Sequence, residues 1–503
     1  MADNFPSTSP GAAGIQYREP LIFEKSQAGR AGVSLPAAGV PEVDPAVELP
    51  KELLRGEIEH MPAVTETEAF RHFVRLSQQN YGLDTGFYPL GSCTMKYNPK
   101  INEWAARLPG FGGAHPMAHF DQCQGALELM YRLERALTEI AGMYETTLEP
   151  AAGAQGELTG LMMVRAYHLD KHGTPRKKVL IPDSAHGTNP ASAALNGYDV
   201  VELKSNREGV LEPGVVAAAM SDDVACLMMT NPNTIGVFER HVKEIAEIVH
   251  GKGGLLYGDG ANMNALLGMA RPGDMGVDVM QYNLHKTFST PHGGGGPGSG
   301  PVAVGKILAP YLPRPRVVKD GDKYRMDFTG EKSVGKLRTF WGNFGMMVRA
   351  YAYIRELGPE GLKACSQLAV LNAQYLRALL SDEYQMAYET RSLHEVVFSD
   401  KKQEEHGVKT MDIAKRLIDH GFHPPTVYFP LIVHNALMIE PTETETKENV
   451  EAFAEAMKAI AREAREDAQA VQAAPQRTLV QRLDEVRAAR KPILRWTPGL
   501  KVE

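Results

Sequence analysis

The stretch NLHKTFSTPHGGGGPGSG at residues 283–300 carries the densest group of informative residues in the chain. Lys286 follows an apolar run that predicts a strand, and a cluster of glycines comes after it. A lysine at the edge of a sheet is partly desolvated, so its amine can lose a proton and act as a nucleophile. We therefore expect Lys286 to form a Schiff base, although most lysines are ordinary surface residues.

The glycines of this stretch also match a second pattern. Gly293, Gly295 and Gly298 satisfy G-x-G-x-x-G, which occurs in dinucleotide-binding folds. That pattern needs a helix that opens within the glycines and an acidic residue at a set distance, whereas Pro291 and Pro297 interrupt this segment. A loop whose backbone amides approach a phosphate explains the segment better.

Asp259 ends the apolar run GGLLYGDG and stands 27 residues before Lys286. A carboxylate at this position can pair with a protonated pyridine nitrogen, which makes the ring an electron sink. The alternative is that Asp259 only begins a turn. We expect the nearby Asn262 and Asn264 to shape the loop rather than to contact a ligand.

Residues 153–156, GAQG, stand directly before a helical pattern. Free backbone amides and the positive end of a helix dipole form a natural site for phosphate there. Small residues commonly precede helices, so Ala154 and Gln155 become phosphate candidates only together with Lys286 and Asp259.

In DSAHGTNPAS (183–192), Asn189 before Pro190 predicts a helix N-cap and leaves His186 in the preceding loop. A histidine there can stack on an aromatic cofactor ring or act as acid and base. A structural role is the alternative. In the loop TNPNTIGVFE (230–239), which also follows a predicted strand, Thr234 or Asn233 can hydrogen-bond the ring hydroxyl of a cofactor.

The segment GFYPLGSCTMKYNPK (86–100) has neither a helical nor a strand period. Its composition suits a loop that holds a small carboxylate or covers a site, and a structural role is equally consistent. Arg338 is a further carboxylate candidate because of its charge.

Short apolar runs alternate with helix-length segments between about 150 and 305. The runs are KKVLIPDS (177–184), DVVEL (199–203), ACLMMTNP (225–232), GGLLYGDG (253–260), GVDVMQYNL (276–284) and GPVAVG (300–305). This alternation indicates βαβ units and a mainly parallel sheet. The fold class is therefore α/β, with its ligand expected at the carboxyl ends of the strands.

The rest of the chain divides into further segments. Apolar residues at helical spacing predict a helix over 124–141 that Gly142 ends, and Thr446 is expected to cap a helix carrying Val450, Phe453, Met457 and Ile460 on one face. VYFPLIVHN and ALMIEPT (427–442) resemble a pair of strands. We expect an N-terminal extended arm with the first helices at 1–85, a large α/β domain at 86–345, a small α+β domain at 346–480 and a tail at 481–503.

Composition excludes several classes of protein. The 503 residues are 43% hydrophobic and 23% charged, which is ordinary for globular proteins. Lys and Arg total 54 against 61 Asp and Glu, a net charge of −7, so no basic field is available to bind nucleic acid. The sequence has no run of 18 apolar residues and no signal peptide, so we expect neither a membrane nor a secreted protein.

The four cysteines are Cys93, Cys123, Cys226 and Cys365. They lie far apart without a C-x-x-C pair, which argues against a disulfide framework and against a zinc site. We expect no metal and a reducing, cytoplasmic location.

Six motifs occur in the order found in one family: YPLGSCTMKYNPK, GAQGE, SAHGTNPAS, GDGANMNA, NLHKTF and PHGGGGPG. Together they resemble the P-protein of the glycine cleavage system, the glycine dehydrogenase (decarboxylating) family. The resemblance spans about 90–300 and continues more weakly through MIEPTETE (438–445). This chain resembles the C-terminal, cofactor-bearing half, which is subunit 2 of the split form.

The resemblance implies a pyridoxal 5′-phosphate enzyme of the aspartate-aminotransferase-like fold (fold type I), with a large, mainly parallel domain and a smaller α+β domain. Lys286 would bind the cofactor as a Schiff base, Asp259 would pair with the pyridinium and His186 would stack on the ring, with Lys286 and His186 catalytic. The other cofactor-binding residues would be Ala154, Gln155, Thr234, Ala261 and His285.

The implied reaction removes carbon dioxide from glycine and transfers the aminomethyl group to the lipoyl arm of H-protein. The implied companion is glycine dehydrogenase subunit 1, in a heterotetramer of two plus two chains. No nucleic-acid or membrane partner is implied. The leading arm has no clear counterpart in the family.

Three other functions compete with this one. Another fold-type-I decarboxylase or aminotransferase would use Lys286 and Asp259 equally well, but YPLGSCTMK argues against it. A non-catalytic partner subunit should have lost Lys286. A nicotinamide dehydrogenase has only the glycine pattern in its favour.

Overall fold

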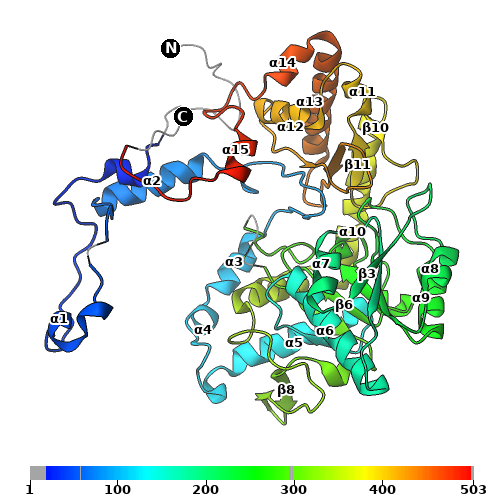
Figure 1. Cartoon of the computed structure of the whole chain (residues 1–503), viewed down its shortest axis with the longest axis horizontal. Coiled ribbons are helices and arrows are strands. Elements are labelled where there is room, and N and C mark those ends of the chain that lie inside the picture. Colours follow the sequence, from blue (N-terminus) through cyan, green and yellow to red (C-terminus); the bar gives the residue numbers. More distant parts are fainter. Residues whose placement is uncertain (1–18, 57, 294–295, 297, 500–503) are drawn as a thin grey trace. The chain divides into compact units, whose positions relative to one another are not determined.

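The computed structural model describes residues 19–56, 58–293, 296 and 298–499 (Figure 1). The chain forms two compact units, one of residues 86–473 (the main unit) and one of residues 1–85 with 474–503 (the terminal unit). Gly295 and Pro297 of the glycine segment lie outside the described residues, as do the first 18 residues of the predicted arm.

The main unit contains a seven-stranded sheet with the order β1-β7-β6-β5-β4-β2-β3. β6, β5, β4, β2 and β3 are parallel, whereas β7 runs antiparallel between β6 and β1. The strands are β1 (Glu145–Thr147), β2 (Lys178–Pro182), β3 (Asp199–Leu203), β4 (Val224–Thr230), β5 (Leu255–Gly260), β6 (Val279–Tyr282) and β7 (Val302–Val304). All six predicted runs are thus confirmed as strands.

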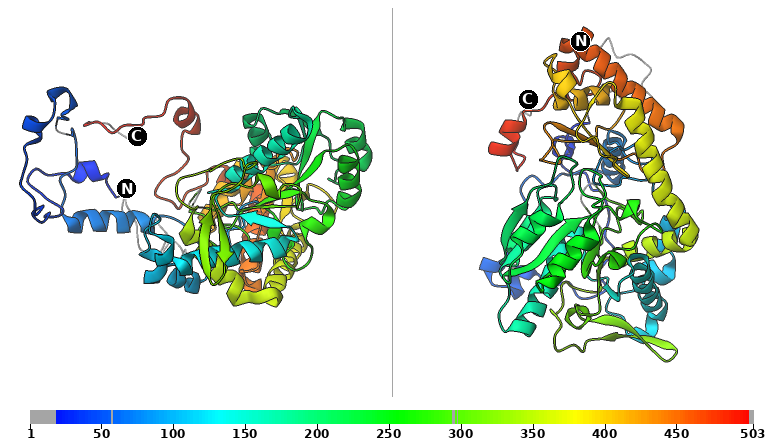
Figure 2. Two further views of the ribbon diagram at one scale, coloured as in Figure 1. Left: turned by 90° about the horizontal axis from the view of Figure 1, so that it is seen from below. Right: turned by 90° about the vertical axis from the view of Figure 1, so that its right-hand side faces the viewer.

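Helices cover both faces of this sheet (Figure 2). Successive strand side chains alternate between the faces, so Tyr257 packs with Leu161 of α6 while its neighbour Leu256 packs with Ile245 of α9. The helices concerned are α5 (Gln124–Ala141), α6 (Gly153–His172), α7 (Thr188–Leu195), α8 (Pro213–Ala219) and α9 (Val242–Gly251).

The predicted helix 124–141 is confirmed as α5. Leu133 and Leu137 are fully buried on its apolar face. Gly142 follows with φ = 66°, a left-handed conformation that favours glycine and ends the helix.

A second, antiparallel sheet has the order β10-β11-β13-β12, with β10 (Gln385–Met386), β11 (Val396–Ser399), β12 (Thr426–Val427) and β13 (Ala436–Ile439). It packs against α10 (Phe344–Leu380), α12 (Thr410–Asp419), α13 (Lys447–Glu466) and α14 (Ala468–Gln472). The Thr446 hydroxyl accepts the Asn449 N–H at 3.3 Å, which confirms it as the cap of α13. The four apolar residues predicted for one face of that helix are all buried.

The expected pair of long strands over 427–442 is only partly correct. β12 stops at Val427, and Tyr428 takes a left-handed φ of 58°. Pro430 follows, and proline has no N–H to donate to a sheet. Residues 428–435 therefore form a loop before β13.

α10 is shared by both cores of the main unit. Its first half packs with the large sheet and its second half with the small one. Gly358 interrupts the helix with φ = 59°, and Pro359 begins the next turn. The remaining elements of the main unit are α3 (Lys100–Ala106), α4 (Pro109–Gly112), α11 (Lys401–Glu404), the hairpin β8 (Arg316–Asp320) and β9 (Lys323–Asp327), and short 3₁₀ turns.

In the terminal unit, three basic side chains surround the carboxylate of Glu19. His72 Nδ1 lies 2.9 Å away, Lys25 Nζ 2.5 Å and Arg75 Nη1 3.4 Å, and together they lower the Glu19 pKa to about 2. The unit's helices are α1 (Pro45–Glu48), α2 (Glu66–Gln78) and α15 (Glu485–Arg490), with 3₁₀ turns at Ile22–Lys25 and Lys51–Leu53. No helix in the described part of the chain is long and apolar enough to span a membrane.

A glycine-to-alanine change tests how closely α6 packs on the sheet. The Cβ added by Gly156→Ala would lie 2.8 Å from both Gln281 Cβ and the Gly300 carbonyl oxygen. Overpacking costs about 1–3 kcal/mol, so we expect a lower free energy of unfolding in urea despite the helix propensity of alanine. Gly125→Ala in α5 is the control, since nothing lies within 4 Å of its added Cβ. Equal stability of the two variants would contradict the close packing.

Candidate active site

The carboxylate of Asp259 lies at the carboxyl end of β5, between two neighbouring strands. It is paired in register with Thr230 of β4 and Gln281 of β6, and both side chains donate to it, Thr230 Oγ1 at 3.4 Å. The N–H of Ala261 donates at 2.9 Å. Asp259 is 4% exposed, so these donors supply the hydrogen bonds that a buried carboxylate needs.

Asn189 supplies a further donor, which corrects the predicted helix cap. α7 begins at Thr188 and its N-cap is Gly187, so Asn189 lies in the first turn. With its amide oriented to satisfy both carboxylates, Asn189 donates to Asp259 and to Glu157 at 3.2 Å each. The side chain binds buried charge instead of capping the backbone.

Lys286 follows β6 in a turn, where its N–H donates to the Asn283 carbonyl at 3.0 Å. Its side chain is half-buried. Within the described parts of the chain, Nζ makes no hydrogen bond or ion pair. The positive charge of Lys286 lies close enough to lower the pKa values of both His186 and His285. A cation buried to this extent and left unpartnered is suited to binding a ligand.

His186 lies in the loop before α7, near both Lys286 and Asp259. Its Nδ1 is 2.9 Å from the Thr188 hydroxyl, and the ring meets Phe429 edge-on at 5.3 Å. Partial burial lowers the His186 pKa, and the positive charge of Lys286 lowers it further. Part of the ring remains accessible to solvent. The imidazole is therefore neutral at neutral pH.

Glu157 of α6 is a site residue that the sequence analysis missed. It accepts hydrogen bonds from the Thr188 hydroxyl at 2.8 Å and the Ser192 hydroxyl at 3.1 Å. Burial, and then the charge of Asp259, raise its pKa to about 8. Glu157 directly follows GAQG, and a glutamate among the apolar residues of α6 was the available signal.

Three chain segments converge at the amino end of α6. Glycines allow this approach, because a Cβ on Gly300 would overlap the Ala152 carbonyl and one on Gly153 would overlap the Asn283 side chain. The first N–H groups of a helix have no partner within the helix. The buried hydroxyls of Ser299 and Thr287 likewise have no hydrogen-bond partner among the residues that the structure describes.

The residues predicted to bind phosphate lie in this first turn, but the Gln155 side chain is already used. Its Oε1 accepts the Ala151 N–H at 2.7 Å and its Nε2 donates to the Leu337 carbonyl at 3.4 Å. The backbone amides of Ala154 and Gln155 therefore remain as the donors for an anion. The contact with Leu337 also brings the neighbouring Arg338 beside this turn.

Of the two candidates in the loop after β4, only Thr234 has its side chain available. Asn233 donates to the Gly209 carbonyl at 2.8 Å and to Glu239 at 2.7 Å, and its oxygen accepts two backbone N–H groups. Thr234 is buried, and no hydrogen bond joins its hydroxyl to the described residues.

His285 is neutral, because burial lowers its pKa to about 3, and its Nδ1 accepts the Ser299 N–H at 3.4 Å.

Asn262 and Asn264 shape their loop, as predicted. Asn262 donates to the Pro232 carbonyl at 2.9 Å. Asn264 accepts from Lys96 Nζ at 2.9 Å. Lys96, only 1% exposed, also donates to Tyr353 at 3.1 Å and to Glu443 at 2.7 Å. The 86–100 segment is thereby fixed to the edge of the site.

Two protein-family models match the chain. Residues 159–295 match aminotransferase class-V, and residues 365–482 match the C-terminal domain of glycine dehydrogenase.

Solved structures share the fold at low sequence identity. A glycine decarboxylase (P-protein) of the glycine cleavage system, in inhibitor-bound form, superposes with a TM-score of 0.70 at 22% identity, over 82% of this chain and 94% of that one. An aspartate aminotransferase from Thermus thermophilus gives 0.54 at 16% identity, over 75% and 99%. The predicted fold type I is confirmed.

Curated relatives match almost the whole chain, so the expectation that the leading arm lacks a counterpart in the family is wrong. The probable glycine dehydrogenase (decarboxylating) subunit 2 of Caldanaerobacter subterraneus subsp. tengcongensis is 56% identical over 477 residues, which cover 95% of this chain and 98% of the relative. The protein of the same name from Halalkalibacterium halodurans is 56% identical over 476 residues, with the same coverage of 95% and 98%. The chain belongs to the glycine dehydrogenase (decarboxylating) subunit 2 family.

Proposed function

We propose that this chain is the catalytic subunit of a glycine dehydrogenase, which decarboxylates glycine and transfers the aminomethyl group to the lipoyl arm of H-protein. One observation carries this proposal. The half-buried amine of Lys286 and the buried carboxylate of Asp259, which donors from both neighbouring strands hold, both lie within electrostatic range of His186. The name that the relatives share supplies the substrate and the loss of its carboxylate.

Pyridoxal 5′-phosphate is the cofactor of this family and fold type. When bound, it supplies an aldehyde that links to amines and a ring that takes up the electron pair left by a departing carboxylate. The residues present fit it, because the site combines an amine and a hydroxyl without partners among the described residues, a fixed carboxylate and a helix amino end. The hydroxyl is that of Ser299, beside the helix end.

Each side chain then has a defined task. Lys286 Nζ would bind the aldehyde, Asp259 would hold the proton on the ring nitrogen, and the neutral imidazole of His186 would cover the ring. The phosphate would meet the backbone amides of Ala154 and Gln155, and the Thr234 hydroxyl would meet the ring hydroxyl. Ala261, whose N–H orients Asp259, and His285, beside Lys286, would complete the binding site.

Glu157 is the carboxyl group beside Asp259 that takes up a proton at neutral pH. Burial of two carboxylates side by side allows only one to carry its charge easily. The raised pKa of Glu157, about 8, means that Glu157 holds the proton at neutral pH. A protonated Glu157 places no second negative charge beside Asp259, the residue that would face the ring nitrogen.

Three partners complete the proposal: glycine, lipoylated H-protein and glycine dehydrogenase subunit 1, in a two-plus-two heterotetramer. The designation of the relatives as subunit 2 supports a companion chain. The terminal unit exposes apolar side chains that a companion could cover, among them Val33, Leu35, Val47, Phe70 and Phe73. We place the enzyme in the cytoplasm, because all four cysteines are free thiols.

Reduction of the loaded protein with borohydride tests the role of Lys286. In the wild type we expect a cofactor–lysine adduct on the peptide that contains Lys286. In Lys286→Ala we expect neither the adduct nor the yellow absorption band before reduction. Lys306→Ala, at an exposed position, is the control and should retain both. An adduct on another lysine would overturn the assignment.

The variant Asp259→Asn tests the charge at the ring nitrogen. Asparagine keeps the shape of the side chain, so the protein should fold, but loses the charge. We expect kcat for glycine decarboxylation, assayed with subunit 1 and lipoylated H-protein, to fall by about 10²–10³-fold, as for other lost electrostatic partners. Asp274→Asn, in an exposed ion pair with Arg271, should retain wild-type kcat. An unchanged rate in Asp259→Asn would contradict this role.

A further inference from the structure

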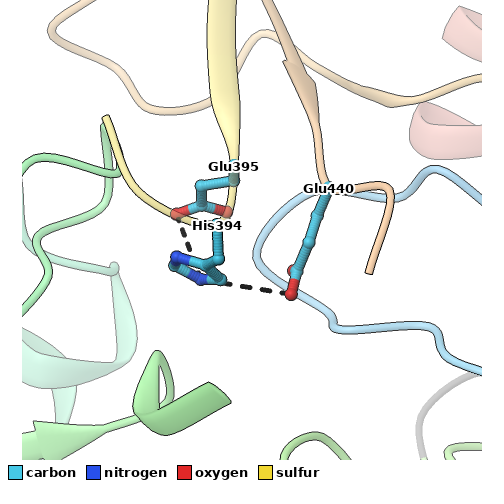
Figure 3. A group of neighbouring side chains, drawn as sticks. All are labelled: His394, Glu395 and Glu440. Carbon is cyan, nitrogen blue, oxygen red and sulfur yellow. Dashed lines mark ion pairs between the residues drawn. The ribbon is translucent and has the colours of Figure 1, made fainter. Parts of the chain in front are cut away.

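Two glutamates and a histidine form a fully buried cluster beside the candidate site (Figure 3). Glu395 immediately precedes β11 and Glu440 immediately follows β13. Since Val396 pairs with Ile439, the two glutamates lie opposite each other across these strands. His394 Nε2 lies 4.0 Å from a carboxylate oxygen of each.

Both carboxylates hold the same loop. The Ser92 N–H donates to Glu395 Oε2 at 3.0 Å, and the Thr94 N–H donates to Glu440 Oε2 at 2.9 Å. Ser92 and Thr94 have φ values of 66° and 47°, which side-chain-bearing residues rarely adopt. Such a backbone persists only where its surroundings stabilise it, and here the two carboxylates do so.

This loop adjoins the segment that carries Lys286. Ser289, three residues after Lys286, accepts the Asn98 side-chain amide at 3.3 Å and donates to the Tyr97 carbonyl at 2.8 Å. Between Ser92 and Thr94, Cys93 is half-buried, and the charge of Lys286 partly offsets the rise in its pKa that burial causes. The loop therefore lies beside the proposed cofactor-binding lysine.

The cluster has too little positive charge nearby to ionise fully. Burial lowers the pKa of His394 to about 3, so its ring is neutral, and neither ring nitrogen has a hydrogen-bond partner in the described chain. Within the described chain, the titratable groups in range are Lys286, the thiol of Cys93 and the carboxylate of Glu443, which Lys96 neutralises. Burial raises the pKa of Glu440 to about 7 and that of Glu395 well above the usual range.

We propose that Glu395 and Glu440 are positioning residues that together hold the loop Ser92–Thr94 in place beside Lys286. The loop would then help to enclose glycine in the site. This inference rests on the proposed function for its effect on catalysis, but the holding of the loop does not depend on it.

The raised pKa values of the two glutamates give the arrangement a defined pH dependence. For a carboxyl whose pKa is raised in the folded state, the cost of ionisation is absent below its ordinary pKa and grows as the pH rises through the folded value. The window here begins near 4.5 and passes through about 7 for Glu440. As the pH rises through this window Glu440 becomes an anion in a buried site, so the loop should be held less firmly in alkaline solution.

Hydrogen–deuterium exchange of the peptide containing residues 91–95 tests the proposal in the full chain loaded with cofactor. Glu440→Ala and Glu395→Ala remove the acceptor, so we expect exchange of the Ser92 and Thr94 amides to rise by about tenfold or more, as for a lost buried hydrogen bond. Glu440→Gln and Glu395→Gln keep an acceptor oxygen and should retain near-wild-type protection at neutral pH. Glu451→Ala, at the surface in a pair with Lys447, is the control and should match the wild type.

A second readout is the rate of Cys93 alkylation by iodoacetamide, mapped by mass spectrometry. Removing either carboxylate also changes the pKa of the Cys93 thiol. The alanine and glutamine variants at one position remove the same charge, so this effect is equal in the two. A faster rate in the alanine variant than in the glutamine variant at one position therefore reports release of the loop. Equal rates, with equal amide exchange, would overturn the proposal.

The protonation of Glu440 is tested by varying the pH. After correction for intrinsic exchange rates, amide protection in the wild type should fall as the pH rises through about 7, and Glu440→Gln should lose this dependence. This measurement remains informative if the alanine variants do not fold. A stoichiometric divalent ion found by elemental analysis of the purified protein would overturn the proposal, because the carboxylates would then be metal ligands.

Activity separates this inference from the proposed function. With subunit 1 and lipoylated H-protein, the alanine variants should raise KM for glycine more than they lower kcat, and borohydride should still trap the cofactor on Lys286. If the wild type shows neither trapping nor glycine decarboxylation, the proposed function fails, whereas the exchange data still decide whether the carboxylates hold the loop.

Discussion

The site depends on the hydrogen bonds that hold the buried carboxylate of Asp259. Burying an anion in a sheet is costly unless donors surround it, and the register of β4, β5 and β6 places Thr230 and Gln281 on either side of it. Parallel strands make this arrangement possible, because their carboxyl ends meet at one edge. The loops that follow these strands carry the other candidate residues to the same edge.

The site also requires that backbone segments approach one another closely. The amino end of α6 can meet the 298–300 segment and Asn283 only because Gly153 and Gly300 lack side chains. The same contacts leave polar atoms such as the Ser299 hydroxyl without a partner among the residues that the structure describes. The proposed site for the phosphate would thus consist mainly of small residues and backbone.

The sequence predicts the large sheet well because its signals are local. Each buried strand is a short apolar run, and helix 124–141 has a clear period and a glycine at its end. The motifs also place Lys286, Asp259 and His186 near one another without a structure. Local signals fail where a distant partner decides the outcome. Asn189 binds buried carboxylates from other elements, and the strand predicted at 427–435 ends early at Val427.

The acidic cluster illustrates the same limit. HEVVFS and MIEPTE contain ordinary strand residues, and nothing in either stretch shows that Glu395 and Glu440 lie opposite each other. Only the register of β11 and β13 brings them together. Glu157 was missed for a related reason, since its partners Thr188, Ser192 and Asp259 come from other segments.

Lys96 has a consequence for how the main unit can move. Its buried ammonium donates hydrogen bonds to three residues. Asn264 follows β5 of the large sheet, Tyr353 lies in α10, and Glu443 follows β13 of the small sheet. Separating the two cores would leave either the cation or its carboxylate buried without a partner, which is strongly destabilising. The two cores should therefore behave as one rigid block, so that substrates reach the sheet edge through rearrangement of loops and not by hinge opening of domains.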